Sequence, residues 1–131
     1  MAMAHEVSTW SKDPSTRVGA VIARGKKFIS LGFNGAPPGV KDRYRHDREK
    51  KLRRTIHAEV NAILAAARSL KGCTIYVTHH PCSQCTAKII ACKIKRVVCP
   101  VPTGIFAERW KEDIEESTLM FKEAKVEVVF T

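Results

Sequence analysis

The feature that most restricts the fold of this 131-residue sequence is the order of its strand-like and helix-like segments. Strand-like apolar runs occupy residues 18–23, 28–33, 74–78, 96–99 and 126–130. Helices are expected at residues 1–11, from about residue 57 to Lys71-Gly72, at 83–92 and at 107–124. Strands that alternate with helices predict parallel crossovers, whereas the short turn at residues 24–27 requires an antiparallel hairpin. We therefore predict an α/β protein with a mixed five-stranded sheet, an antiparallel first hairpin and helices on both faces.

The 3.6-residue period of the helices predicts which of their residues are buried. These are Val60, Ile63, Leu64 and Ala67 in the first long helix, Ala87, Ile90 and Ala91 in the next, and Trp110, Ile114, Leu119, Met120 and Phe121 in the last. The chain is 44% hydrophobic and 27% charged, which is the balance of a globular domain. Its length fits a single domain over residues 1–131.

Several classes of protein are disfavoured by composition. No apolar run approaches the roughly 18 residues of a membrane span, so no membrane partner is expected. The first residues lack the basic and apolar regions of a secretory signal. The five cysteines are an odd number, which argues against a disulfide framework. We expect a reducing, cytoplasmic setting.

Half of the net charge of +10 comes from residues 41–54, which hold eight basic and three acidic side chains. Excess positive charge attracts anionic ligands. One interpretation is a solvated loop and surface helix, and the other is recognition of phosphate groups on nucleotides or nucleic acid. Tyr44 is the one aromatic residue in this segment, which weakens the case for a base-stacking platform.

Two short motifs carry the chemistry, His57-Ala58-Glu59 and Pro81-Cys82-Ser83-Gln84-Cys85. Residues three apart lie on one face of a helix, about 5–6 Å apart at Cβ. Two thiolates at that spacing can bind one tetrahedral metal ion, and the positive end of a helix favours the thiolate form.

His57 and Glu59 would point about 200° apart on a regular helix. They can share one site if the helix begins within a residue or so of His57, which is our prediction. Cys92 lies about 10 Å further along its helix than Cys85, and Cys73 and Cys99 are expected in the core. His79 and His80 are weaker alternatives, so we favour three protein ligands plus water, which is the pattern of a catalytic zinc.

The net charge of the metal site explains why a carboxylate is needed beside it. A zinc ion with two thiolates and a neutral imidazole has no net charge, so its water should be less acidic than on a three-histidine zinc, where the pKa is about 7. A general base is then needed, and Glu59 can serve as one.

H-x-E followed by P-C-x-x-C is the zinc-deaminase signature. With the segments Ser11–Ala20 and Gly32–Gly39, the chain resembles the deoxycytidylate (dCMP) deaminase family, including its compact phage-type members. The resemblance implies a three-layer α/β/α cytidine deaminase-like fold. It also implies one zinc ion on His57, Cys82 and Cys85, with Glu59 as proton shuttle. Hydrolysis of dCMP to dUMP and ammonia, feeding thymidylate synthesis, would follow.

The resemblance also suggests ligand contacts. Asn34 and the backbone of Ala58 would contact the substrate, and Lys12, Ser15 and Arg17 are candidates for its 5′-phosphate. The run after the fourth strand lacks a Tyr that many members carry, which leaves Phe106 or Trp110 as substitutes. The family is commonly hexameric, activated by dCTP and inhibited by dTTP, each with Mg²⁺. Candidate effector contacts are Gly35, Arg43, Arg48 and Arg68, and the setting would be the host cytoplasm for a viral protein.

Two other functions compete. A tRNA adenosine deaminase shares both motifs but needs a cationic surface for RNA, and the predicted last helix is net acidic. A nonenzymatic, zinc-stabilised nucleic-acid-binding module would close its metal with a fourth ligand and would not need Glu59. We therefore expect a nucleotide substrate rather than nucleic acid.

Overall fold

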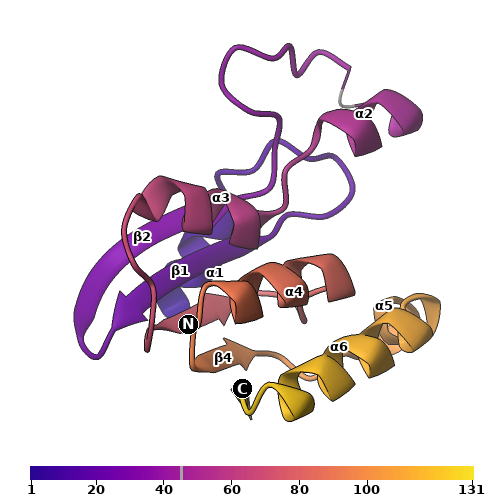
Figure 1. Ribbon diagram of the computed structural model, residues 1–131. Coiled ribbons are helices and arrows are strands. Elements are labelled where there is room, and N and C mark those ends of the chain that lie inside the picture. Colours follow the sequence, from indigo (N-terminus) through magenta and orange to yellow (C-terminus); the bar gives the residue numbers. More distant parts are fainter. Residues whose placement is uncertain (45) are drawn as a thin grey trace.

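The computed structural model describes residues 1–44 and 46–131, so Arg45 of the basic segment lies outside the described residues (Figure 1). Its helices and strands are α1 (Ala2–Ser8), β1 (Gly19–Arg24), β2 (Lys27–Phe33), α2 (Arg48–Arg54), α3 (Ala58–Ala66), β3 (Thr74–Val77), α4 (Ser83–Ala91), β4 (Arg96–Cys99), α5 (Gly104–Arg109), α6 (Lys111–Glu123) and β5 (Glu127–Phe130). All five predicted strands are present, and α2 lies in the basic segment, for which one of the two interpretations included a surface helix.

The five strands form one mixed sheet in the order β2-β1-β3-β4-β5. β1 pairs antiparallel with both β2 and β3, while β3, β4 and β5 run parallel. The predicted antiparallel hairpin and the parallel crossovers of the second half are both confirmed.

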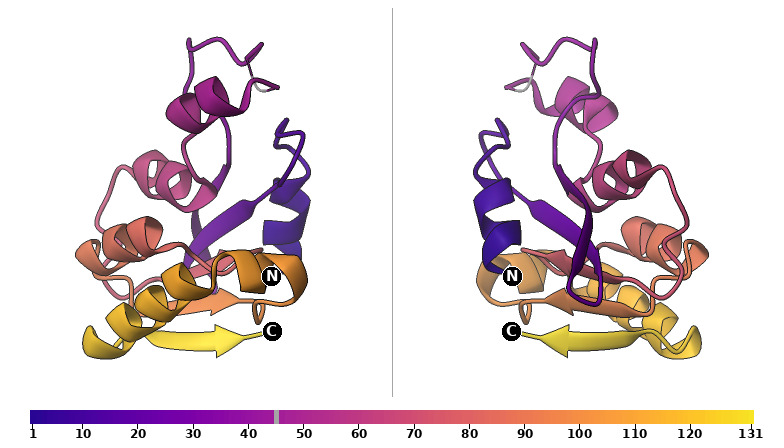
Figure 2. Two further views of the ribbon diagram at one scale, coloured as in Figure 1. Left: turned by 90° about the vertical axis from the view of Figure 1, so that its right-hand side faces the viewer. Right: turned by 90° about the vertical axis from the view of Figure 1, so that its left-hand side faces the viewer.

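Helices cover both faces of this sheet, which gives the three layers expected (Figure 2). On one face, Ala4 and Val7 of α1 pack against Val21. On the other, α3, α4 and α6 enclose the main core, to which Ile89 and Phe121 contribute side chains that are almost fully buried. The first four residues of β1 are all buried, because helices cover both faces of the sheet at this strand.

α3 lies very close to β2, and this contact changes which of its residues are buried. A Cβ atom at Gly32 would collide with the backbones of Ala58 and Ala62, and Ser30 Oγ donates to the carbonyl of Ala62 over 2.8 Å. The buried face of α3 is therefore formed by small residues and Glu59. The predicted apolar stripe was wrong at Leu64, which is 64% exposed, and at Ala67, which is also exposed, while Val60 and Ile63 are half-buried.

The ends and faces of the other helices also differ from the prediction. α3 stops at Ala66 because Ala67 adopts the left-handed conformation, with φ of 50°. Thr86 and Ile89 form the buried face of α4, in place of the expected Ala87 and Ala91.

The single helix expected over residues 107–124 is instead two, α5 and α6. They meet at Trp110, whose backbone leaves helical geometry. Phe121 is buried as predicted, whereas Trp110 and Leu119 are about half exposed and Ile114 and Met120 are half-buried.

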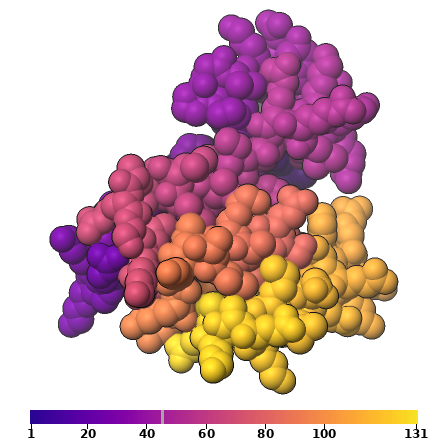
Figure 3. Space-filling view, in the orientation of Figure 1, coloured from indigo at the N-terminus to yellow at the C-terminus, as the bar shows by residue number. Residues whose placement is uncertain are grey.

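The segment between β2 and α3 stands out from the body of the molecule (Figure 3). Asp47 caps α2 by accepting a hydrogen bond from the backbone of Lys50. Three cationic groups, on Arg43, Lys50 and Arg54, lie 4.2–4.9 Å from the centre of the Tyr44 ring. Part of the basic segment is therefore organised on one aromatic side chain.

Within the described part of the chain, none of the helices combines the length and apolar character needed to cross a membrane.

Candidate active site

The start of α3 is fixed by a backbone pair between Gly35 and Ile56. The amide of each donates to the carbonyl of the other, over 3.1 and 2.9 Å. Asn61 adds a side-chain hydrogen bond of 2.8 Å to the carbonyl of Phe33. These contacts hold His57 in extended geometry, with φ of −67° and ψ of 153°, as the residue that precedes α3. The prediction that a helix begins within a residue or so of His57 is confirmed.

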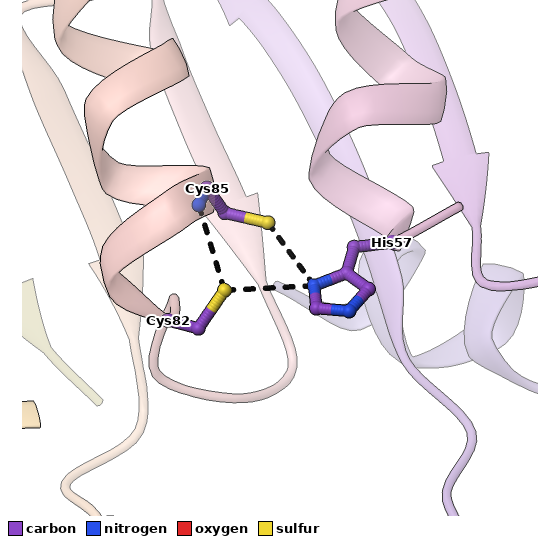
Figure 4. A group of neighbouring side chains, drawn as sticks. All are labelled: His57, Cys82 and Cys85. Carbon is purple, nitrogen blue, oxygen red and sulfur yellow. Dashed lines mark hydrogen bonds between the residues drawn. The ribbon is translucent and has the colours of Figure 1, made fainter. Parts of the chain in front are cut away.

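The second motif lies where the loop after β3 leads into α4. Cys82 immediately precedes the helix, and its sulfur accepts a hydrogen bond from the amide of Cys85 over 3.5 Å. The loop therefore places Cys82 and the first turn of α4 beside the start of α3 (Figure 4).

The two motifs converge on one point. His57 Nδ1 lies 3.2 Å from Cys85 Sγ and 3.6 Å from Cys82 Sγ, and all three ligand atoms fall within 4.8 Å of one another (Figure 4). Around a tetrahedral zinc, with bonds of about 2.0–2.3 Å, neighbouring nitrogen and sulfur ligands would be about 3.5 Å apart. The donor set and its spacing therefore fit a zinc ion.

The two cysteines are unequal in their protonation. A hydrogen bond from the Cys85 thiol lowers the pKa of Cys82 to about 4, although burial of Cys82 opposes this effect. The hydrogen bond to Cys82 is the largest cause that raises the pKa of Cys85, and burial is the second. These shifts favour the thiolate form at Cys82, beside the imidazole, and a metal would displace the proton of Cys85.

Glu59 lies in the first turn of α3 with only 5% of its surface exposed. Burial is the largest influence on this carboxyl and raises its pKa. Glu59 lines a pocket of about 250 Å³ together with His57 and Cys82, which we call the Glu59 pocket. A buried carboxyl with a raised pKa, next to a candidate metal site, is suited to accepting and returning protons.

Asn34 also lines the Glu59 pocket, and its side chain already supports the neighbouring loop. Its Oδ1 accepts from the amide of Val18 and its Nδ2 donates to the carbonyl of Thr16, each over 2.8 Å. An amide nitrogen has two hydrogens, so one donor remains for a ligand. Ala58 lines the same pocket.

The three residues predicted for the phosphate lie outside the set that lines the Glu59 pocket. Lys12 pairs with Asp42 at 3.8 Å, and Arg17 Nε donates to the carbonyl of Asp13 over 3.5 Å. Ser15 accepts a hydrogen bond of 3.4 Å from Lys51.

Lys51 was missed by the sequence reasoning. Among the described residues it is the one lysine or arginine that lines the Glu59 pocket. Its position six residues before His57 was a signal, but seven other basic residues in the same segment obscured it.

A second cavity of about 430 Å³ lies between residues 34–44 and α2. Its cationic lining residues are Lys12, Lys41, Lys51 and Arg54, and its aromatic ones are Trp10, Phe33 and Tyr44. Of the candidate effector contacts, Gly35 lines this cavity. Arg43 instead stacks on Tyr44, and Arg48 and Arg68 are exposed residues outside the lining.

The far wall of the Glu59 pocket is aromatic and imidazole-rich. Phe106 packs edge-on against His79, with ring centres 5.5 Å apart, and Trp110 lines the pocket rather than the core. His80 Nδ1 lies 3.0 Å from the carbonyl of Pro81. Neither histidine belongs to the three-residue metal group, and burial lowers the pKa of both.

The fold defines the broad class of this protein. The chain superposes on the dCMP deaminase of cyanophage S-TIM5, solved in complex with dCMP and dUMP, with a TM-score of 0.81 over 99% of this chain and 92% of that one. At 22% identity this likeness concerns the fold, which is that of the cytidine deaminases.

The sequence then defines the family. Residues 1–101 match the model of the cytidine and deoxycytidylate deaminase zinc-binding region. The chain is 54% identical to a deaminase from Aliivibrio fischeri named for the luxG 3′ region, over 98% of this chain and 88% of that protein. It is 38% identical to mouse deoxycytidylate deaminase, over 96% of this chain and 74% of that protein. The chain belongs to the cytidine and deoxycytidylate deaminase family and is a deaminase.

Proposed function

We propose that this chain hydrolyses dCMP to dUMP and ammonia at the Glu59 pocket. The observation that carries this proposal is the placement of the buried Glu59 carboxyl in one pocket with His57 and Cys82, beside Cys85. Relatives across most of the chain are named deoxycytidylate deaminases, which supports dCMP as the substrate.

In this proposal His57, Cys82 and Cys85 hold one zinc ion, which supplies a Lewis acid that activates water when it is bound. Glu59 would take the two protons of the attacking water in turn, delivering the first to N3 and the second to the 4-amino group of cytosine. The bond from C4 to the amino nitrogen breaks, a bond from C4 to oxygen forms, and ammonia leaves. Burial assists Glu59 because a raised pKa lets it hold a proton between these steps.

The base would be oriented by the backbone of Ala58 and by the apolar wall of the pocket. Phe106 and Trp110 supply that wall, together with Leu52 and Ile114. An aromatic wall favours a planar base. Asn34, with its remaining amide hydrogen, would contact the sugar.

For the 5′-phosphate we now favour Lys51 over Lys12, Ser15 and Arg17. Its ammonium is 3.2 Å from Asp13 Oδ1 and 3.4 Å from Ser15 Oγ, and its side chain is 15% exposed. An ammonium has three donors, so one is left for an anion in the pocket. Asp13 would hold the ammonium in place.

The test is a substrate panel for the zinc-loaded chain, with ammonia release as the readout. We expect turnover of dCMP well above that of deoxycytidine, dCTP and a tRNA anticodon stem-loop. Ammonia from the stem-loop without any from dCMP would replace this proposal with tRNA adenosine deamination. Ammonia release from deoxycytidine as fast as from dCMP would show that the enzyme does not select the monophosphate.

We also propose that dCTP activates and dTTP inhibits the enzyme, each with Mg²⁺, at the 430 Å³ cavity. Its four cationic and three aromatic lining residues suit a triphosphate and a base. Measuring dCMP turnover with each effector tests this, and no change with either would contradict it. We further propose that the enzyme is a cytoplasmic homo-oligomer, expected as a hexamer, and that its product feeds thymidylate synthesis. Light scattering would measure the mass of the assembly.

A further inference from the structure

The segment that carries both cysteines is held by a side chain from the other end of the chain. Asp113, in the first turn of α6, accepts two hydrogen bonds from Ser83, which lies between Cys82 and Cys85. Its Oδ2 accepts from the Ser83 amide over 2.9 Å, and its Oδ1 accepts from the Ser83 hydroxyl over 2.6 Å. Both carboxylate oxygens are therefore engaged with one residue of the metal-binding motif.

One turn further along α6, Ser117 holds the same segment at two more points. Its fully buried hydroxyl donates to the carbonyl of Pro81 over 3.1 Å and lies 2.5 Å from the hydroxyl of Thr86. Residues four apart share a helix face, so Asp113 and Ser117 form one polar stripe. This stripe contacts Pro81 before the two cysteines, Ser83 between them and Thr86 after them.

The charge of Asp113 suits this position. The first turn of a helix leaves amide groups without partners inside the helix and carries partial positive charge. A carboxylate that accepts from the first residue of α4 satisfies one such amide and stabilises the helix start. The hydroxyl of Ser83 is also fixed, so the backbone between the two sulfurs has little freedom to rotate.

We propose that Asp113 is a positioning residue for the metal ligands, acting through Ser83 to keep both cysteine sulfurs facing His57. This inference rests on the proposed zinc site. Without the Asp113 contacts, part of the free energy of zinc binding would be spent on ordering residues 81–86. Outer-shell partners of metal ligands commonly change metal affinity by about 10- to 100-fold.

The experiment is a competition between the full chain and a chromophoric chelator for zinc. The variants are Asp113→Ala, Asp113→Asn and, as a matched control, Glu116→Ala, which is exposed on the same helix. We expect Asp113→Ala to weaken zinc binding about 10- to 100-fold. Asp113→Asn should lose less, because its carbonyl can still accept from the Ser83 amide. Glu116→Ala should stay within about twofold of the wild type.

A second measurement separates positioning from simple helix stabilisation. A purely structural cap would lower the melting temperature of the metal-free chain without changing its zinc affinity or the spectrum of the cobalt-substituted site. Positioning predicts a changed cobalt spectrum in Asp113→Ala and partial recovery in Asp113→Asn. If Asp113→Ala does not fold, Asp113→Asn is compared with the wild type on the same criteria.

Unchanged zinc affinity and an unchanged cobalt spectrum in the folded Asp113 variants would overturn this inference alone. A wild-type chain that binds no zinc would overturn the metal site itself, and the positioning role with it.

Discussion

The Lys51 ammonium donates to the Asp13 carboxylate over 3.2 Å, and both side chains are largely buried. This ion pair joins α2 to the loop after α1, two segments that lie 38 positions apart in the sequence. Both residues line both cavities, as do Asn34 and Thr55. A ligand in either cavity would therefore meet the same ion pair, which makes Lys51 the most informative residue to change.

Replacing Lys51 with Met should reduce kcat/KM for dCMP about 10- to 100-fold, because a hydrogen bond to a charged group contributes about 1.5–3 kcal/mol. Deoxycytidine has no phosphate, so its turnover should change much less. The measurement is the ratio of kcat/KM for the two substrates. Lys12→Met and Arg17→Met are matched controls that should leave this ratio near the wild-type value. An unchanged ratio in Lys51→Met would assign the phosphate to other groups.

The Asp13 carboxyl predicts a pH-dependent contribution to stability. Burial opposes its ionisation, but hydrogen bonds from the amides of Thr16 and Ser15, together with Lys51, outweigh burial and lower its pKa below the ordinary 3.8. The folded state therefore binds this proton less readily than the unfolded state, so the stabilisation is complete above the ordinary pKa and disappears as pH falls through the lower folded value.

Urea unfolding of the wild type and Asp13→Asn at several pH values checks this expectation. The stability difference between the two should be largest near neutral pH and should shrink below about pH 4. If the difference in unfolding free energy stayed constant down to the lowest pH measured, the charge of Asp13 would not contribute to stability.

Gly32→Ala should destabilise the fold by about 1–3 kcal/mol or more, because the new methyl group would overlap the backbone of α3. α3 carries Glu59, so activity should fall along with stability. Gly35→Ala is the matched control, since a Cβ there meets nothing within 4 Å. Equal unfolding midpoints in urea for Gly32→Ala and the wild type would mean that α3 can move away from β2 at no cost.

The sequence was most informative where spacing alone determines geometry. The C-x-x-C pair and the strand–helix alternation follow from local periodicity. The position of His57 just before a helix follows from the requirement that His57 and Glu59 share one site. The structure agrees on all three. Phe121 was likewise identified as core.

The features that the sequence did not predict depend on tertiary contacts, which periodicity does not encode. Leu64 is exposed because the close approach of α3 to β2 at Gly32 buries the alanine face of the helix instead. Trp110 was expected in the core, but the break between α5 and α6 places it at the Glu59 pocket. Lys51 becomes distinct from the other basic residues only through its contact with Asp13.

The most direct test of the central claim is to measure zinc content and dCMP turnover in the same preparations of the wild type and Glu59→Gln. Gln keeps the size of the side chain but cannot carry protons as a carboxyl does. We predict one zinc per chain in both proteins and a loss of turnover of at least about 10²–10⁴-fold in Glu59→Gln. Turnover of dCMP that survives in Glu59→Gln at full zinc content would contradict the account.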